Sequence, residues 1–347
     1  MSAAPLELPE EVLAPGSALD DALARLIDEG RTGIALRAPA SVRTGGPSGL
    51  QLAGCSVETL REAARRPPFE SMAILAAAQL ETGRVRAGRA FADRTEGANA
   101  HSPVDPGEGY TGRVFRLDVA SRLGIPLVPG PIAVWLIARD RVAGPAHILV
   151  EDPPPIGIED PEVTKYLAAW RKRNPVKPQG ADPATVWPEE TVFGTYPRYR
   201  KTAESPPMPD SGIALWVKPL VVLGEGPAWA LTGSFRLSIP RRHVVLKPLS
   251  GNATTAVVPI TLVITSNEIA GPFVRHLRVP SHSSISPLDA APVVEGHFNI
   301  NLLSFSVRWR APRTYFVYAV CGNTMSSPAT SALMPKALRE RVPRSGG

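Results

Sequence analysis

The chain has 347 residues, of which 44% are apolar, and 38 basic residues against 32 acidic ones give a formal net charge of +6. The apolar content excludes general disorder, and the modest charge permits an acidic partner without requiring one. The 38 prolines far exceed the usual share of roughly 5%. Because proline ends helices and cannot donate within a central strand, this composition favours short strands and turns over long helices.

Residues 1–32 predict a short helical arm. Apolar residues recur there at helical spacing, Ser17 is placed to cap the helix, and Gly30 is placed to end it. A second short helix is predicted to begin at Ser56 and to end before Pro67. No secretory signal is visible, and no apolar run approaches the roughly 20 residues that span a bilayer. We therefore expect a cytoplasmic protein without a membrane span.

Residues 33–151 change to the two-residue periodicity of strands and predict a first β-domain. Short apolar runs alternate with turn residues, and Thr82 followed by Gly83 indicates a hairpin. Residues 72–76 fit a buried strand or a short helix, which periodicity does not distinguish. The last strands of this domain are predicted at residues 115–119, 132–138 and 147–150.

Residues 152–210 predict a helix followed by a proline-rich connector. Basic and aromatic side chains are interleaved there, which is typical of protein interfaces and of surfaces that stack on nucleic-acid bases. A solvated surface, with cations stabilising a helix C-terminus, accounts for the same pattern. The candidate partner-binding residues are Arg171, Lys172, Arg173, Trp187, Tyr196, Arg198, Tyr199, Arg200 and Lys201.

Residues 211–335 predict a second β-domain, and residues 336–347 predict a basic tail. Phe235, Leu237 and Ile239 alternate with polar residues, the pattern of a half-buried antiparallel strand. We expect these three side chains to be buried and the residues between them to face outward.

A pattern of strand, apolar run and Pro-Ala pair occurs twice, with the copies 183 positions apart. Such a match indicates one β-unit built twice. The sequence therefore predicts a mainly β fold of two β-sandwich-like domains with an internal duplication, a few short helices and a proline-rich connector. Phe115, Trp135 and Pro145 should correspond to Phe298, Tyr318 and Pro328.

The residue types that carry chemistry show no recognisable pattern. The two cysteines, Cys55 and Cys321, exclude a disulfide framework and are best explained as buried thiols. His276, His282 and His297 lie on predicted strands but lack metal-ligand spacing. No serine lies in a nucleophile elbow. We predict no catalytic residue, no metal site and no cofactor.

These features favour a non-enzymatic structural or assembly protein that contacts other protein subunits through its β-domains and connector. The expected partner is another protein or a second copy of the chain, and nucleic acid is the less favoured partner. One alternative is a carbohydrate- or ligand-binding module that exposes Trp216 or Trp229. A second alternative is an enzyme whose site is assembled from dispersed residues.

Overall fold

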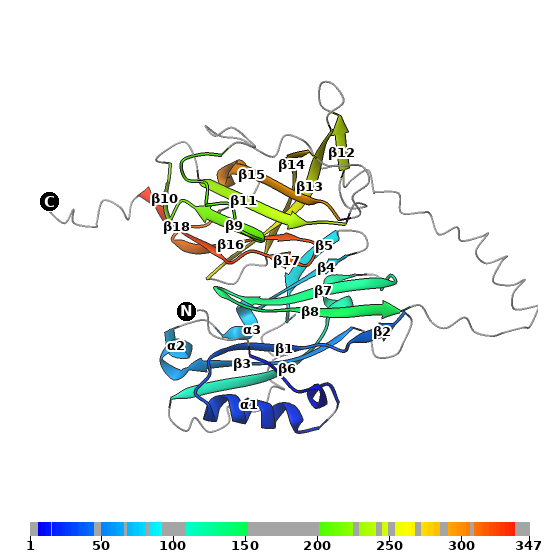
Figure 1. Cartoon of the computed structure of the whole chain (residues 1–347). Helices are drawn as coiled ribbons and strands as arrows, with labels where there is room; N and C mark the ends of the chain where they lie inside the picture. The colour runs from blue at the N-terminus through cyan, green and yellow to red at the C-terminus, as the bar shows by residue number, and fades with distance from the viewer. Residues whose placement is uncertain are drawn as a thin grey trace, which may run out of the picture.

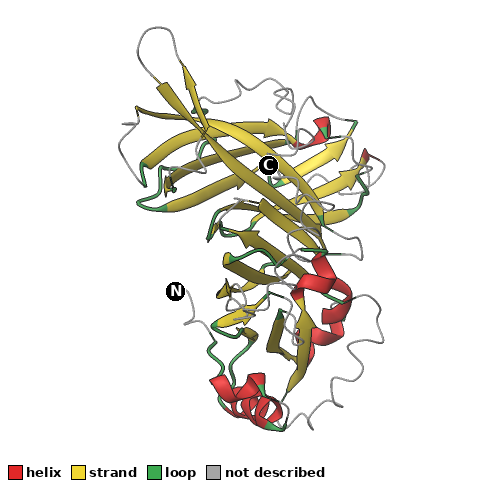
Figure 2. Cartoon of the chain, turned by 90° about the vertical axis from the view of Figure 1, so that its right-hand side faces the viewer, coloured by secondary structure: helices red, strands yellow, loops and turns green. Residues whose placement is uncertain are grey.

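The computed structural model describes residues 6–14, 16–44, 50–65, 68–80, 84–91, 109–125, 127–151, 201–224, 229–240, 245–248, 254–267, 272–284, 291–305 and 309–336. The chain is mainly β, as predicted, and its helices are short and lie mainly on the N-terminal half (Figure 2). Within these ranges, no helix is long and apolar enough to cross a membrane.

The N-terminal half, residues 33–151, consists of a three-stranded and a five-stranded sheet, preceded by a short 3-10 helix and a helix. The small sheet has the order β1-β3-β6 and the large sheet the order β2-β8-β7-β4-β5. The elements are η1 (Glu10–Leu13), α1 (Ala18–Asp28), β1 (Gly33–Arg37), β2 (Ser41–Arg43), β3 (Gln51–Thr59), α2 (Leu60–Arg65), α3 (Phe69–Met72), β4 (Ile74–Gln79), β5 (Arg84–Arg89), β6 (Tyr110–Asp118), α4 (Val119–Leu123), β7 (Gly130–Ala138) and β8 (Arg141–Glu151).

The C-terminal half, residues 212–335, repeats this plan. Its small sheet has the order β9-β11-β15, and its large sheet has the order β10-β18-β16-β13, with β12 and β14 both paired to β13. The elements are β9 (Gly212–Val217), β10 (Leu220–Leu223), β11 (Ala230–Ser238), β12 (Val245–Pro248), β13 (Thr254–Ser266), β14 (Phe273–Ser284), β15 (Val293–Asn301), η4 (Leu302–Ser304), β16 (Arg313–Cys321), β17 (Thr324–Met325) and β18 (Ala329–Pro335).

Both helices predicted near the N-terminus exist; the start of the first at Ser17 is confirmed, whereas the start of the second at Ser56 is wrong. Ser17 precedes α1, yet its hydroxyl lies 3.4 Å from the Asp21 carboxylate and caps no backbone N–H. Ser56 belongs to β3, because this segment continues to pair with β1 and β6. The second helix, α2, begins after Thr59, whose hydroxyl accepts the backbone N–H of Glu62 at 3.2 Å. Pairing on both sides of β3 outweighs the local helix signal.

The two halves share strand order, direction and register. In each half the second strand is parallel to the last one, β2 to β8 and β10 to β18. Gly54 of β3 lies opposite Phe115 of β6, and Gly233 of β11 lies opposite Phe298 of β15. Trp135 and Tyr318 likewise occupy matching positions, opposite Ala76 on β4 and Val263 on β13. Two of the predicted pairs, Phe115 with Phe298 and Trp135 with Tyr318, therefore lie on equivalent strands. In the third pair, Pro145 lies on β8, whereas Pro328 directly precedes β18.

The glycines opposite the two phenylalanines make room for the aromatic rings. A Cβ on Gly54 would overlap the ring of Phe115, and a Cβ on Gly233 would overlap the ring of Phe298. Both rings are buried in the cores between the sheets. Glycine is therefore required here by close packing, at the same place in each half.

Replacing Gly233 by alanine should lower the free energy of unfolding by about 1–3 kcal/mol, because the added methyl group displaces a packed ring. Urea denaturation measures this loss. Gly88→Ala is the matched control, since a Cβ there meets only the end of a flexible side chain, Leu123 Cδ2 at 3.1 Å. Equal losses in the two variants would contradict the packing explanation.

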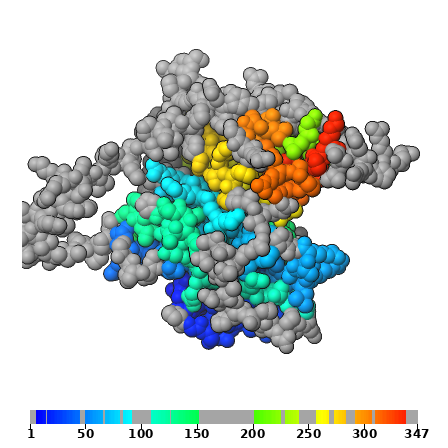
Figure 3. All heavy atoms as spheres, turned by 180° about the vertical axis from the view of Figure 1, so that it is seen from behind, coloured from blue at the N-terminus to red at the C-terminus, as the bar shows by residue number. Residues whose placement is uncertain are grey.

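The four sheets stack in layers, with the two large sheets back to back (Figure 1). The large sheets meet through a cluster of buried residues drawn from both halves, in which Trp135 and Tyr318 are the largest side chains. Seen from behind, the N-terminal and C-terminal halves contact each other directly (Figure 3). The Tyr318 hydroxyl donates a hydrogen bond to the carbonyl oxygen of Arg139 in the other half. Burial raises the pKa of this phenol above its usual range, so it stays a neutral donor.

The outer face of the N-terminal small sheet is covered by α1. The apolar face of this helix buries Leu19, Leu23 and Leu26 against apolar residues of the sheet, among them Cys55 and Val57. Figure 1 shows the helix as the outermost layer at that end of the molecule.

Candidate functional site

Lys201 is the one predicted partner-binding residue within the described part of the chain, and it is exposed. Arg171, Lys172, Arg173, Trp187, Tyr196, Arg198, Tyr199 and Arg200 lie outside the described residues. Lys201 begins a segment, residues 201–210, that lies on the outer face of β9-β11-β15. We call this segment the strap.

The strap is held to the sheet by two hydroxyl groups of β11. Thr232 Oγ1 donates to the carbonyl oxygen of Glu204 at 3.0 Å, and Ser234 Oγ donates to that of Pro206 at 2.6 Å. Both hydroxyl residues point away from the core, because residues alternate along a strand and Phe235 points into it. Both are nevertheless 0% exposed. A polar sheet face is thus covered by the chain's own backbone.

Three cross-strand rows make up this face. The first row is Trp216, Thr232 and Asn299, the second is Ala214, Ser234 and His297, and the third is Gly212, Arg236 and Glu295. In the third row, Arg236 Nε donates to Glu295 Oε1 at 3.0 Å, and both side chains are more than one third exposed. Such an exposed pair contributes little stability, so the hydroxyl residues of the first two rows and the strap define the site.

His297 lies at the edge of the strap, beside a second histidine. Its Nδ1 is 2.9 Å from Ser234 Oγ, and its ring centroid is 5.5 Å from that of His282 on β14. Burial lowers the pKa of His297 below its ordinary value, and the nearby His282 and Lys201 lower it further. The ring is therefore mostly neutral at pH 7. Protonation would place a positive charge beside Lys201 and His282.

The Ser234–His297 pair does not have the geometry of a catalytic dyad. Ser234 Oγ donates its proton to Pro206, so it accepts from the Nδ1–H tautomer of His297. A general base must accept the serine proton, and its nucleophile must reach substrate. Ser234 is buried beneath the strap. The pair fixes the strap in place and does not activate a nucleophile.

His276 on β14 is a second histidine with an unusual environment. Its Nδ1 lies 2.8 Å from the hydroxyl of Thr261 on β13. Burial lowers the pKa of His276 from 6.5 to about 4, and the neighbouring Arg275 adds to this shift. Because the unfolded chain takes up this proton more readily than the folded chain, stability is complete above pH 6.5. It is lost as the pH falls from there toward 4.

Acidification from pH 7.5 to 5 should lower the free energy of unfolding by about 2 kcal/mol through His276 alone. His276→Gln keeps a hydrogen-bonding group near Thr261 and removes the titration, so its stability should depend less on pH by that amount. Urea denaturation at the two pH values measures the difference between the proteins. If the two proteins lost the same free energy of unfolding between these pH values, the lowered pKa of His276 would not be the cause of the pH dependence.

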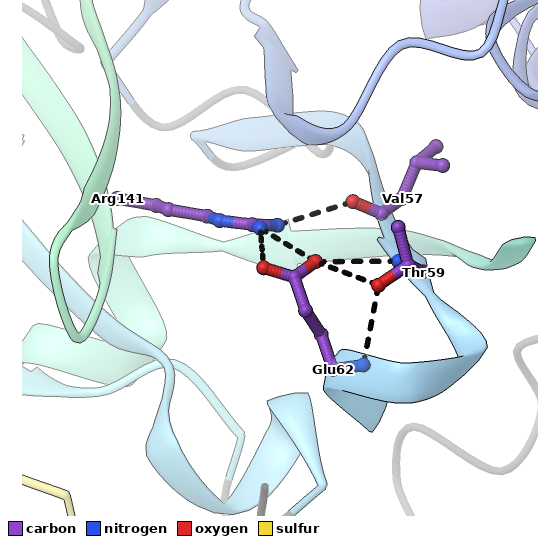
Figure 4. Close-up of polar contacts among 4 residues, drawn as sticks. All are labelled: Val57, Thr59, Glu62 and Arg141. Atoms are coloured by element: carbon purple, nitrogen blue, oxygen red, sulfur yellow. Dashed lines mark hydrogen bonds and ion pairs between the residues drawn. The ribbon is translucent and has the colours of Figure 1, made fainter. Parts of the chain in front are cut away.

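A separate polar cluster joins the two sheets of the N-terminal half (Figure 4). Arg141 Nη2 donates to both carboxylate oxygens of Glu62 at 2.9 Å, and its Nη1 donates to the Val57 carbonyl at 3.2 Å. Glu62 also accepts from the N–H and the hydroxyl of Thr59, both at 3.3 Å. The Thr59–Glu62 pair is a capping box for α2. These groups satisfy one another, which indicates a structural role.

Other candidates from the sequence have structural surroundings. Burial raises the pKa of both Cys55 and Cys321 to about 12, which keeps the thiols protonated and unreactive. Trp229 is fully buried, and its Nε1 donates to Ser331 at 2.9 Å, so it cannot present its ring to a sugar. Trp216 is half-buried on the strap-covered sheet. In the described ranges, no three or more His, Cys, Asp or Glu residues are grouped so that they could hold a metal ion.

No known protein family matches the sequence, and no curated protein is similar to it. The site therefore has to be interpreted from its own geometry. The strap could not be predicted from the sequence, because its contacts depend on tertiary structure. The available signal was the hydroxyl residues Thr232 and Ser234, which alternate with the apolar residues of β11.

Proposed function

We propose that the protein is a non-enzymatic structural or assembly protein that contacts other protein subunits through its β-sandwich-like halves and its connector. The observation that supports this most directly is the packing of two copies of one β-unit against each other through their large sheets. Equivalent residues, Trp135 and Tyr318, occur in the same buried cluster, as in the two-fold interfaces of dimers. The β-unit is therefore suited to association through its sheet faces.

The polar clusters also favour this proposal over the enzymatic one. Ser234 is covered and bonded to backbone, and Glu62 and Arg141 bind each other. Perturbed groups at an active site are expected to converge where substrate can reach them. Here they serve the packing of the fold. The strap, which is the last part of the predicted connector, lies on a sheet face.

The test is charge reversal of Arg198, Arg200 and Lys201 to glutamate in the full chain. Association with the protein's partners should weaken without unfolding, because these three basic residues would contact the partner. Affinity purification from the native host identifies the partners, and sedimentation velocity measures the association. A control that reverses three exposed arginines elsewhere, Arg61, Arg86 and Arg89, carries the same change in net charge.

Two outcomes would overturn this assignment. Unchanged binding to every native partner would show that the basic segment is a solvated surface. Binding to nucleic acid that falls steeply with salt would favour the nucleic-acid alternative.

A further inference from the structure

The outer faces of the two small sheets are equivalent in position but opposite in chemistry. With Gly54 and Gly233 in register, Ala53, Cys55 and Val57 on β3 correspond to Thr232, Ser234 and Arg236 on β11. The N-terminal face is apolar and is covered by α1. The C-terminal face is polar and is covered by the strap, which contains neither helix nor strand and begins with a turn at Thr202–Ser205. The second face is thus built to hold peptide backbone.

The spacing of the contacts defines which peptide fits. Thr232 and Ser234 are two residues apart and donate to the carbonyls of Glu204 and Pro206, which are also two residues apart. Pro206 and Pro207 have no N–H group, so this part of the strap cannot pair as a β-strand. Recognition uses two carbonyl acceptors, that of Glu204 within the turn Thr202–Ser205 and that of Pro206 directly after it. The ligand class is a proline-containing segment that begins with a turn.

The strap is attached so that a neighbouring copy can receive it. Five residues, Pro207 to Ser211, separate its second anchored carbonyl from the start of β9 at Gly212. Fully extended, they span about 17 Å. Two copies whose β9-β11-β15 faces approach within such a distance can exchange straps. Each exchanged strap would make the same hydrogen bonds that it makes in its own chain.

We propose that this face is a binding site for a proline-containing segment that begins with a turn and that, in the assembled protein, the strap of a second copy fills it. The inference rests on the proposed assembly function and names the contact that joins two copies. Exchange of an identical element needs no new complementary surface, which makes it a low-cost route to a dimer.

The test uses two exposed positions that both lie near His297, Lys201 on the strap and His282 on β14. A full-length Lys201→Cys chain carrying an affinity tag is mixed with an untagged His282→Cys chain and treated with a short bismaleimide. Cys55 and Cys321 are buried and should not react. Exchange predicts a cross-linked dimer that contains one chain of each kind. As a control, a single chain that carries both substitutions is cross-linked at high dilution, where links form only within one chain. This shows whether the bismaleimide spans the distance between the two cysteines.

The rate of exchange provides a second readout. Thr232→Val with Ser234→Ala removes both hydroxyl donors and should speed the appearance of cross-linked dimer about ten-fold, because the strap opens more easily. The equilibrium should change little, since the same bonds are lost in both arrangements. A chain with only Ser238→Ala, an exposed hydroxyl on the same strand, should exchange at the original rate.

The outcomes separate this inference from the proposed function. If sedimentation shows association but the mixture yields no cross-linked dimer, strap exchange is wrong and assembly through other surfaces stands. If copies do not associate at any concentration, strap exchange is wrong. The proposed function is then tested by whether other proteins co-purify with the chain from the native host. Absence of cross-linking in both the mixture and the double variant would show that the strap does not lie on this face.

Discussion

Replacing Trp135 by alanine is expected to lower the free energy of unfolding by about 3–5 kcal/mol, the range for large aromatic residues in packed cores. Trp135 is 1% exposed and lies between the two large sheets, in the cluster that contains Tyr318. Removing the indole ring would therefore leave a cavity between the two halves of the molecule. Urea denaturation followed by two probes, one in each half, would measure both the loss and any separation of the two transitions.

Two further variants make this experiment specific. Trp135→Phe should cost much less, since it keeps an aromatic ring in the cluster. Val142→Ala changes an exposed side chain of the adjacent strand β8 and should have little effect. A loss below about 1 kcal/mol for Trp135→Ala, outside the range for packed aromatic residues, would mean that the halves do not stabilise each other through this cluster.

Replacing Phe235 by alanine is expected to cost about 3–5 kcal/mol as well, but within the C-terminal half. Phe235 is 0% exposed in the core between the sheets, and the sequence predicted this from the alternation along its strand. Leu237 and Ile239 are buried with it, and Arg236 and Ser238 face outward, so the predicted strand is confirmed. Thermal and urea denaturation would both report the loss.

Val293→Ala is the matched control for Phe235→Ala. Val293 lies on the neighbouring strand β15 and is exposed, so truncating it removes apolar surface that is already in water. If Phe235→Ala and Val293→Ala reduced stability equally, the core assignment of β11 would be refuted.

The duplication could be predicted from the sequence because its last strands keep a constant separation. Equivalent residues such as Phe115 and Phe298 are 183 positions apart. The first strands are equally similar, with Gly-Ile-Ala-Leu at Gly33 and again at Gly212, but these copies are 179 positions apart. A search at a single spacing therefore misses them. Insertions and deletions in loops change the spacing, whereas pairing within sheets preserves the strands.

The candidate site could be predicted only in part, for a different physical reason. Alternation showed that Ser234 would face away from the core, and the strand has that orientation. The same pattern cannot show that a segment 28 positions away in the sequence covers this outward face and buries Thr232 and Ser234 completely. The basic connector was predicted as a surface from composition, and of its candidate residues Lys201 is the one that the structure describes.

Because the two halves belong to one chain, each can acquire amino-acid substitutions independently of the other. In a dimer of identical chains, every substitution appears twice, so both outer faces must tolerate it. Here one gene specifies two separately encoded versions of the same unit, as the apolar residue Cys55 and its polar counterpart Ser234 illustrate. One version can remain a permanently covered scaffold while the other acquires a new contact. Symmetry no longer restrains the second half, and the shared large-sheet interface keeps the two together.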